Sequence, residues 1–123
     1  MGIATVNLAE TFARFSDHWS PKIVGAVNDA YVKVVKAQGE FVWHAHAQED
    51  EFFLVIAGQL HIRLRDGELT LGAGEFVVIP RGVEHQPYAP DEVQFMLLEP
   101  KSTTHTGTTE SELTVSIEQQ QWR

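Results

Sequence analysis

The chain has 123 residues, 43% of them hydrophobic and 21% charged, which is the composition of one globular domain with room for a core. Its formal net charge of -8 argues against nucleic acid and anionic membrane surfaces as partners, because both select basic patches. The absence of cysteine excludes disulfides and thiolate ligands. Neither a basic start followed by an apolar run nor eighteen successive apolar residues occurs, so we expect a cytoplasmic protein without a membrane span.

A short helix is predicted near the N-terminus. Asn7 can cap it, because Glu10 stands three residues later, and Pro21 breaks the pattern by holding the preceding residue extended. The apolar stripe of this helix consists of Leu8, Phe12 and Phe15. We expect residues 1–21 to form a segment that covers the rest of the domain or a partner.

From residue 23 onward the chain alternates between short apolar runs and turn residues, which predicts an all-β domain. Asn28 and Asp29 join two runs as a hairpin, and Asp66 with Gly67 predicts a second hairpin with a type I′ turn. Gly58 marks a bend. The expected strands cover 23–27, 30–35, a run after 39 that carries two histidines, 51–57, 59–65, 69–71, 76–79, 93–98 and a terminal strand over 113–117.

Four residues have the types and spacing of transition-metal ligands. His44 and His46 are separated by one residue, so they share a face of a strand. Glu51 opens the next apolar run, and His85 follows the turn at 80–82. Three imidazoles with one carboxylate suit Zn, Fe, Mn, Ni or Co better than Mg or Ca, so we expect one divalent transition metal ion as cofactor. His18, His61 and His105 are expected to lie outside this set, His61 because it falls on a polar face.

These residues resemble the two sequence motifs of the cupins. The first motif, G-x5-H-x-H-x3–4-E-x6-G, matches Gly39, His44, His46, Glu51 and Gly58, with four residues after the first glycine instead of five. The second, G-x5-P-x-G-x2-H-x3-N, matches Gly74, Pro80, Gly82 and His85, but Ala89 replaces the final Asn. We interpret that Asn as a turn residue outside the ligand set, whose role Pro90 can take over.

The resemblance implies a jelly-roll barrel of two antiparallel sheets with the metal at its mouth. We expect a single cupin domain over 1–123, with a motif core at 39–89, an N-terminal covering segment at 1–21 and a C-terminal tail at 100–123. The chain is similar to small cupins described as mannose-6-phosphate isomerase-like. The family's spacing also favours Glu51 over its neighbours Glu49 and Asp50 as the carboxylate ligand.

Three functions remain open, because this fold hosts many activities. The chain could be a metal-dependent isomerase, epimerase or dioxygenase acting on a small polar metabolite, a non-catalytic module that captures or senses a small molecule, or a metal-free barrel used for assembly. No second titratable pair is evident beside the ligands, which disfavours sugar isomerisation. Strand parity predicts a pocket wall of Glu40, Val42, Phe53, Val55, Gln86 and Tyr88, with Tyr88 as a candidate proton donor.

A homodimer is also predicted. If His44 and His46 point inward, Phe41 and Trp43 on the same strand point outward. Together with the outer faces of 76–79 and 93–98 they would leave an apolar surface larger than monomers usually expose. The alternative is that the N-terminal segment covers this face of its own barrel.

Overall fold

The computed structural model describes residues 2–103, 106–107 and 114–120. The helices are α1 (Leu8–Phe12) and α2 (Ile117–Gln120). The strands are β1 (Lys22–Val27), β2 (Ala30–Glu40), β3 (Glu51–Ala57), β4 (Gln59–Leu64), β5 (Gly67–Gly72), β6 (Phe76–Ile79) and β7 (His85–Pro100).

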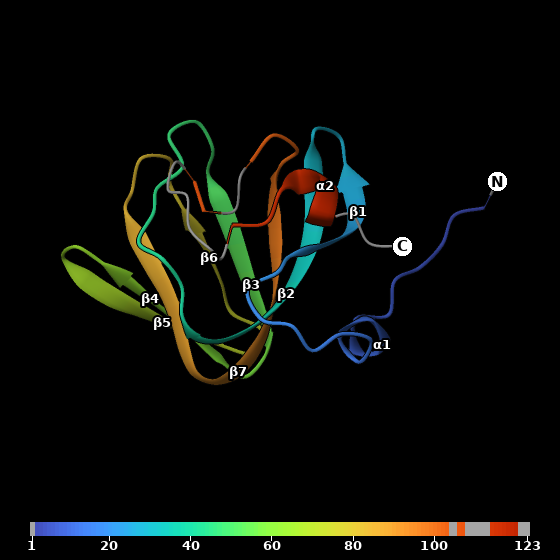
Figure 1. Cartoon of the computed structure of the whole chain (residues 1–123), viewed down its shortest axis with the longest axis horizontal. Helices are drawn as coiled ribbons and strands as arrows, with labels where there is room; N and C mark the ends of the chain where they lie inside the picture. Colours follow the sequence, from blue (N-terminus) through green and yellow to red (C-terminus); the bar gives the residue numbers. More distant parts are fainter. Residues whose placement is uncertain (1, 104–105, 108–113, 121–123) are drawn as a thin grey trace.

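The strands pair in antiparallel fashion and close around one interior (Figure 1). The order β1-β2-β7-β3-β6 forms one wall, while β4 pairs with β5 and with β7. The first part of β7 pairs with β4, for example Tyr88 with His61, and the second part pairs with β2 and β3, for example Leu97 with Lys33 and Phe53. Because β7 serves both walls, it closes the barrel, and the prediction of an all-β cupin fold with a short N-terminal helix is confirmed.

The core follows the two-residue period of the strands. In β3 and β7, alternate residues such as Phe53, Val55 and Phe95 are buried. Gly58 bends the chain between β3 and β4 with a φ of 87°, and a Cβ atom there would lie 2.8 Å from the Glu92 carbonyl oxygen. Only glycine fits this close approach without strain, as the expected bend requires.

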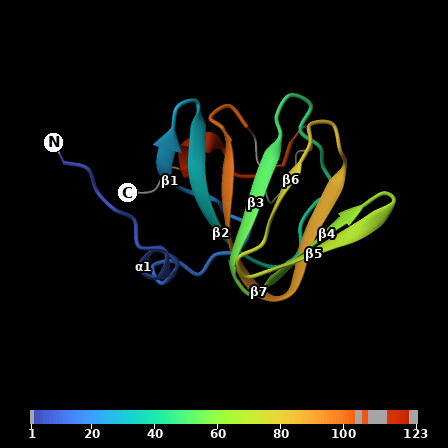
Figure 2. The ribbon, with the colours of Figure 1, turned by 180° about the vertical axis from the view of Figure 1, so that it is seen from behind.

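The N-terminal segment covers part of its own barrel, and α1 lies outside the walls beside β1 and β2 (Figures 1 and 2). Asn7 caps α1 as predicted, because its Oδ1 accepts a hydrogen bond from the Glu10 N–H at 3.0 Å. Farther along, the Trp19 N–H donates to the Lys36 carbonyl at 2.9 Å, and its indole stacks on Phe41 with ring centroids 4.8 Å apart. Trp19 therefore fills the barrel end next to β2.

Several predicted elements are wrong in detail. The strand expected after residue 39 does not form. Instead, β2 ends at Glu40, and residues 41–50 are irregular apart from an isolated bridge at His44. The hairpin near Asp66 exists, but its turn residues are Arg65 and Asp66, and Gly67 already belongs to β5 without a positive φ, so the turn is not type I′. Residues 117–120 form α2 instead of a terminal strand, and Leu113 lies outside the described residues.

The predicted outward position of Phe41 is also wrong. Phe41 is buried in the core, because the chain leaves the strand conformation before it and the two-residue alternation no longer applies. Trp43 is partly covered by the Arg65 guanidinium, which lies 3.8 Å from the ring centroid. In the part of the chain that the structure describes, no helix is long and apolar enough to cross a membrane.

Candidate metal centre

Backbone hydrogen bonds hold the two histidines of the irregular segment in place. The His44 N–H donates to the His85 carbonyl at 3.0 Å, and the His85 N–H returns a bond to the His44 carbonyl at 2.9 Å. The His46 carbonyl accepts from the Gly82 N–H at 2.8 Å. The 41–50 segment is therefore fastened to the turn at 80–82 and to the start of β7, which brings the two motifs together.

The four predicted ligands converge in the barrel interior. His44, His46, Glu51 and His85 are all buried, and one potential ligand atom from each lies within 4.8 Å of the others. Glu51 Oε1 lies 3.0 Å from His85 Nε2 and 3.3 Å from His46 Nε2. This set of three imidazoles and one carboxylate could hold a transition metal ion.

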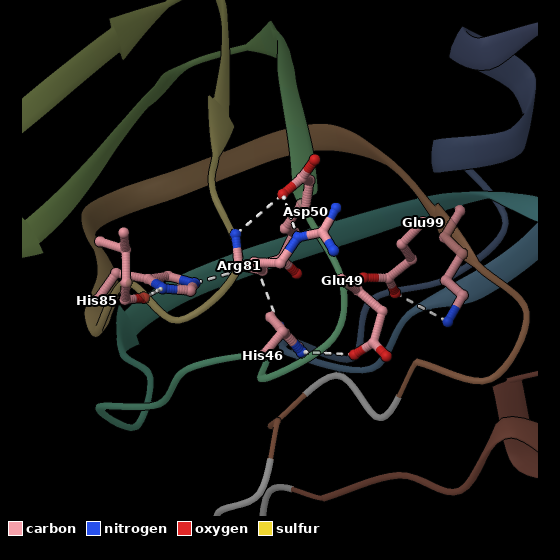
Figure 3. Close-up of polar contacts among 9 residues, drawn as sticks. His46, Glu49, Asp50, Arg81, His85 and Glu99 are labelled. Atoms are coloured by element: carbon pink, nitrogen blue, oxygen red, sulfur yellow. Dashed lines mark hydrogen bonds and ion pairs between the residues drawn. The ribbon is translucent and has the colours of Figure 1, made fainter.

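The orientation of the imidazole rings suits metal binding. His44 Nδ1 lies 2.9 Å from the Val42 carbonyl. His85, which Figure 3 shows, has its Nδ1 2.9 Å from the Val83 carbonyl. A carbonyl accepts only from a protonated Nδ1, so the Nε2 of each ring is the atom left to face the interior and, when unprotonated, to offer its lone pair to a metal ion. Such outer hydrogen bonds commonly orient metal-ligating histidines.

Three ring nitrogens of the cluster are left without a hydrogen-bond partner among the described residues. They are His44 Nε2 and both nitrogens of His46, all buried. Buried polar atoms without partners are rare and costly, so each calls for an explanation. A cation at the centre of the cluster would satisfy the two Nε2 atoms, while His46 Nδ1 faces Glu49 Oε1 at 4.0 Å.

Burial and the neighbouring charges shift the pKa values of the ionisable groups in the cluster. Burial lowers the pKa of His44 to about 4, so this ring is neutral at pH 7. For His46 burial lowers the pKa, but the Glu51 carboxylate, whose Oε1 lies 3.3 Å from His46 Nε2, outweighs it, and the pKa is raised overall. Despite its burial, Glu51 has a lowered pKa because the rings of His46 and His85 lie 3.3 and 3.0 Å from its Oε1, so it stays ionised.

The two neighbouring carboxylates do not replace Glu51. Asp50 turns away and accepts a hydrogen bond from the Arg81 N–H at 2.9 Å, with the Arg81 guanidinium 3.7 Å away (Figure 3). Glu49 faces the outer nitrogen of His46. The preference for Glu51 therefore agrees with the geometry, and Glu49 is an outer partner that can orient the His46 ring.

A groove reaches the cluster from the side of the N-terminal segment. Its unfilled volume is about 310 Å³ including the opening. Among the described residues that line it, His44 and Glu51, both candidate ligands, carry the ionisable side chains. The others are Trp19, Pro21, Val35, Phe41, Phe53, Pro87, Phe95 and Leu97. The route to the cluster is thus apolar and mostly walled by residues that the sequence did not single out.

Of the predicted pocket wall, only Phe53 lines this groove. Val42 and Val55 belong to the packed core, and Glu40 is exposed. Gln86 and Tyr88 point outward, because His85 is inward and the strand alternates from there. The parity assigned to these two residues was therefore wrong by one position.

Tyr88 is consequently not a proton donor at the cluster. Its hydroxyl donates to Glu68 Oε2 at 2.6 Å, and its ring stacks on His61 with centroids 4.8 Å apart. His61 and His18 lie outside the ligand set as expected, since His61 bonds Thr70 and His18 bonds Glu92. His105 lies outside the described residues.

A second buried polar group was missed by the sequence analysis. Lys33 Nζ lies 2.9 Å from Glu99 Oε1 and 2.5 Å from Gln120 Oε1, and the side chains of Lys33 and Glu99 are both fully buried. Burial and the charge of Glu51 raise the pKa of Glu99 to about 7, although Lys33 opposes the shift. A lysine within an apolar strand was the signal that the sequence offered for this group, but Glu99, the partner of Lys33, is remote in sequence.

The C-terminal part of the chain also touches the ligand segment. Gly107 lies against the Ala45 backbone between the two histidines, and a Cβ atom at Gly107 would come 2.1 Å from the Ala45 carbonyl oxygen. Its φ of 63° likewise favours glycine. A side chain at this position would have to displace the segment that carries His44 and His46.

Solved structures with this architecture include proteins of clear sequence similarity. A cupin-2 domain containing protein from Shewanella frigidimarina NCIMB 400 is 49% identical, with a TM-score of 0.77 over 77% of this chain and 93% of that one. The protein NMB1881 from Neisseria meningitidis is 28% identical, with a TM-score of 0.71 over 79% of this chain and 99% of that one.

A curated relative and a family model agree with these structures. The uncharacterized protein YdbB of Bacillus subtilis (strain 168) is 38% identical over 64 residues, which are 51% of this chain and 57% of that protein. This chain thus matches little more than half of that relative's length. The family model described as the cupin domain matches residues 31–101. That region contains both motifs and all four candidate ligands, and the chain belongs to the cupin family.

Proposed function

We propose that this chain is a metal-dependent cupin that binds one divalent transition metal, Zn, Fe, Mn, Ni or Co, through His44, His46, Glu51 and His85. The observation that carries the proposal is the convergence of four buried potential ligands, among which His44 Nε2 and both His46 nitrogens have no hydrogen-bond partner within the described residues. Four protein ligands would leave one or two positions for a small ligand, which distinguishes such a site from a closed structural one.

A bound metal would supply Lewis-acid polarisation of a ligand oxygen. The chain's own residues have other tasks. The carbonyls of Val42 and Val83 fix the His44 and His85 rings, and ionised Glu51 offsets part of the cation's charge. The apolar groove excludes water from the side of Trp19 and Phe41.

Catalysis is favoured over passive capture by one observation. Lys33 and Glu99 provide the second titratable pair whose apparent absence disfavoured sugar isomerisation in the sequence analysis. The likeness to mannose-6-phosphate isomerase gains no such support, because the described residues that line the groove include no Lys or Arg to meet a phosphate. We therefore propose a metal-dependent isomerase, epimerase or dioxygenase of a small non-phosphorylated molecule, with a ligand-capturing module as the second candidate.

Metal analysis of the untagged protein tests this proposal. The protein is stripped with a chelator, equilibrated with each of the five metals, and analysed for bound metal per chain. We expect one ion per chain for at least one metal. Anaerobic loading with Fe(II), followed by oxygen uptake with candidate substrates, separates a dioxygenase from the other classes. Less than a tenth of an ion per chain with every metal would overturn the proposal.

We further propose that the chain forms a homodimer through the outer face of β3, β6 and β7. Phe76 is 63% exposed, Val78 47% and Leu98 37%. They are contiguous, because Phe52 pairs with both Val78 and Leu98 and its ring lies 5.2 Å from that of Phe76. The N-terminal segment lies beside β1 and β2 and leaves this face open (Figure 2). A second copy would remove such a patch from water.

Light scattering at micromolar concentration tests the dimer. Phe76→Glu should yield a folded, metal-binding monomer, whereas Val27→Glu, a matched change at an exposed valine on β1, should leave the dimer intact. Trp43→Glu should also preserve it, because Arg65 already covers Trp43. A wild-type monomer, or a dimer that persists in Phe76→Glu, would contradict the proposed interface.

A further inference from the structure

The buried Lys33–Glu99 pair has no evident role in stability. Both side chains are fully buried, and taking two charges out of water costs several kcal/mol each, about as much as their attraction returns. Apolar residues of similar volume would commonly serve the fold as well. A pair retained at such a position therefore points to a role in the chemistry of the interior.

The pair is neutral in charge but incomplete in hydrogen bonds. Lys33 donates to Gln120 Oε1 and faces Glu99 Oε1 at 2.9 Å, whereas Glu99 Oε2 and the buried hydroxyl of Thr103 have no hydrogen-bond partner within the described ranges. An ionised carboxylate only accepts, with room for about four hydrogen bonds. A donor from outside the described chain would satisfy it.

Strand parity places this pair next to the groove that reaches the metal cluster. Val35 and Leu97 line the groove, and two residues along the same strands, on the same inward face, stand Lys33 and Glu99. Figure 3 shows Glu99 on the side of Glu49, away from His85. The pair and the cluster thus share one interior.

We propose that the Lys33–Glu99 pair is a polar subsite for the metal's ligand, in which Glu99 accepts a hydrogen bond from a ligand hydroxyl. This inference rests on the proposed metal site. A ligand that reaches both carries a hydroxyl in addition to its metal-binding oxygen, as small hydroxy acids and hydroxy carbonyl compounds do. Because Lys33 neutralises Glu99, the subsite selects a neutral donor over a charged group.

Glycolate and acetate test the subsite, since they differ only in the hydroxyl. Co(II)-loaded protein is titrated with each, and dissociation constants are read from the visible spectrum of the ion. Lys33→Met combined with Glu99→Leu replaces the pair without leaving an unpaired charge. We expect the wild type to prefer glycolate about tenfold more strongly than this double variant does, with acetate affinity unchanged. Chelation by glycolate alone contributes equally in both proteins and cancels in this comparison.

Glu99→Gln is the second variant, because it keeps the volume of the side chain if the double variant does not fold. It should lower the preference for glycolate in the same direction. An unchanged preference in the folded, metal-loaded variants would overturn the subsite, as would a metal-loaded wild type that binds neither probe. A wild type that takes up no metal would instead refute the proposed function, so the two failures are distinguishable.

Discussion

The barrel interior contains two buried polar clusters that differ in how they are completed. In the metal cluster, three imidazoles converge on one carboxylate, and His44 Nε2 and both His46 nitrogens have no hydrogen-bond partner among the described residues. In the second cluster, Lys33 already supplies the cation that Glu99 needs. The first is thus incomplete without an ion, whereas the second is balanced in charge and lacks only hydrogen bonds.

The difference shows that buried polar groups in one small domain can indicate two different kinds of ligand. Orphaned lone pairs that point to a common centre indicate a ligand of opposite charge. An ion pair with free acceptor positions indicates a neutral polar ligand. Removing one member of each cluster should therefore have different consequences, and the predictions below use this contrast.

The largest expected effect comes from breaking the ion pair on one side only. Lys33→Met leaves the Glu99 carboxylate buried without its counter-charge and should lower the free energy of unfolding by about 3–5 kcal/mol. Lys33→Met with Glu99→Leu should lie within about 1 kcal/mol of the wild type. Urea unfolding of the metal-free proteins measures both. Equal destabilisation by the single and double changes would show that packing, not charge, explains the loss.

In the metal cluster, removal of one side chain should weaken metal binding more than it destabilises the fold. Glu51→Ala removes a ligand and should weaken metal binding by more than about a hundredfold, beyond the loss typical of outer partners. Glu49→Ala, the matched control, should cost about tenfold, because Glu49 faces only the outer nitrogen of His46. Chelator competition measures both affinities, and stoichiometric metal retained in Glu51→Ala would refute the ligand assignment.

The pH dependence of metal binding should follow the histidines and not the ion pair. The pKa of His46 is raised, so its proton must leave before the metal binds, and affinity should fall as pH falls through that value. Because that pKa lies above the ordinary histidine value of 6.5, we expect about a tenfold loss of affinity per pH unit at pH values below it. His44, with its pKa near 4, adds nothing until the pH approaches that value. Glu99→Gln should leave the slope unchanged, and a flattened slope would place Glu99 among the ligands.

The smallest effect on metal is expected at Ala89, which belongs to neither cluster. Ala89 is fully buried within β7 and does not lie in a turn, so the turn role inferred for the family's Asn does not apply here. Ala89→Asn should leave metal affinity within about twofold, because the position is outside the ligand set, and should reduce stability by about 1–3 kcal/mol through an unpaired amide. Metal analysis and thermal unfolding check the two parts, and a large gain in metal occupancy would contradict the first.

Much of the fold and the ligand set could be predicted because their signals are local. His44, His46 and Glu51 lie close together in sequence, and the turn at 80–82 announces His85. Strand alternation placed Phe53 and Val55 in the interior correctly. Gln86 was assigned to the wrong face although the signal was present, because alternation from the inward-pointing His85 turns Gln86 outward.

What could not be predicted depends on contacts between distant residues. Lys33 and Glu99 are sixty-six positions apart, and each alone resembles an ordinary strand residue. Phe41 is buried because Trp19 stacks on it, a contact that sequence periodicity does not contain. The helix α2 shares only Ile117 with the predicted terminal strand, because an alternation of three apolar residues is too short to distinguish a strand from a loop that leads into a helical turn.

The contact between Gly107 and Ala45 has a consequence for how the site is made. The two residues are sixty-two positions apart, so the contact closes a long loop and is expected to form late in folding. During synthesis all four ligand residues leave the ribosome before Gly107 does. A nascent chain would thus hold the full set of metal ligands before the contact that fixes the segment between two of them, and metal uptake can begin before the final docking step.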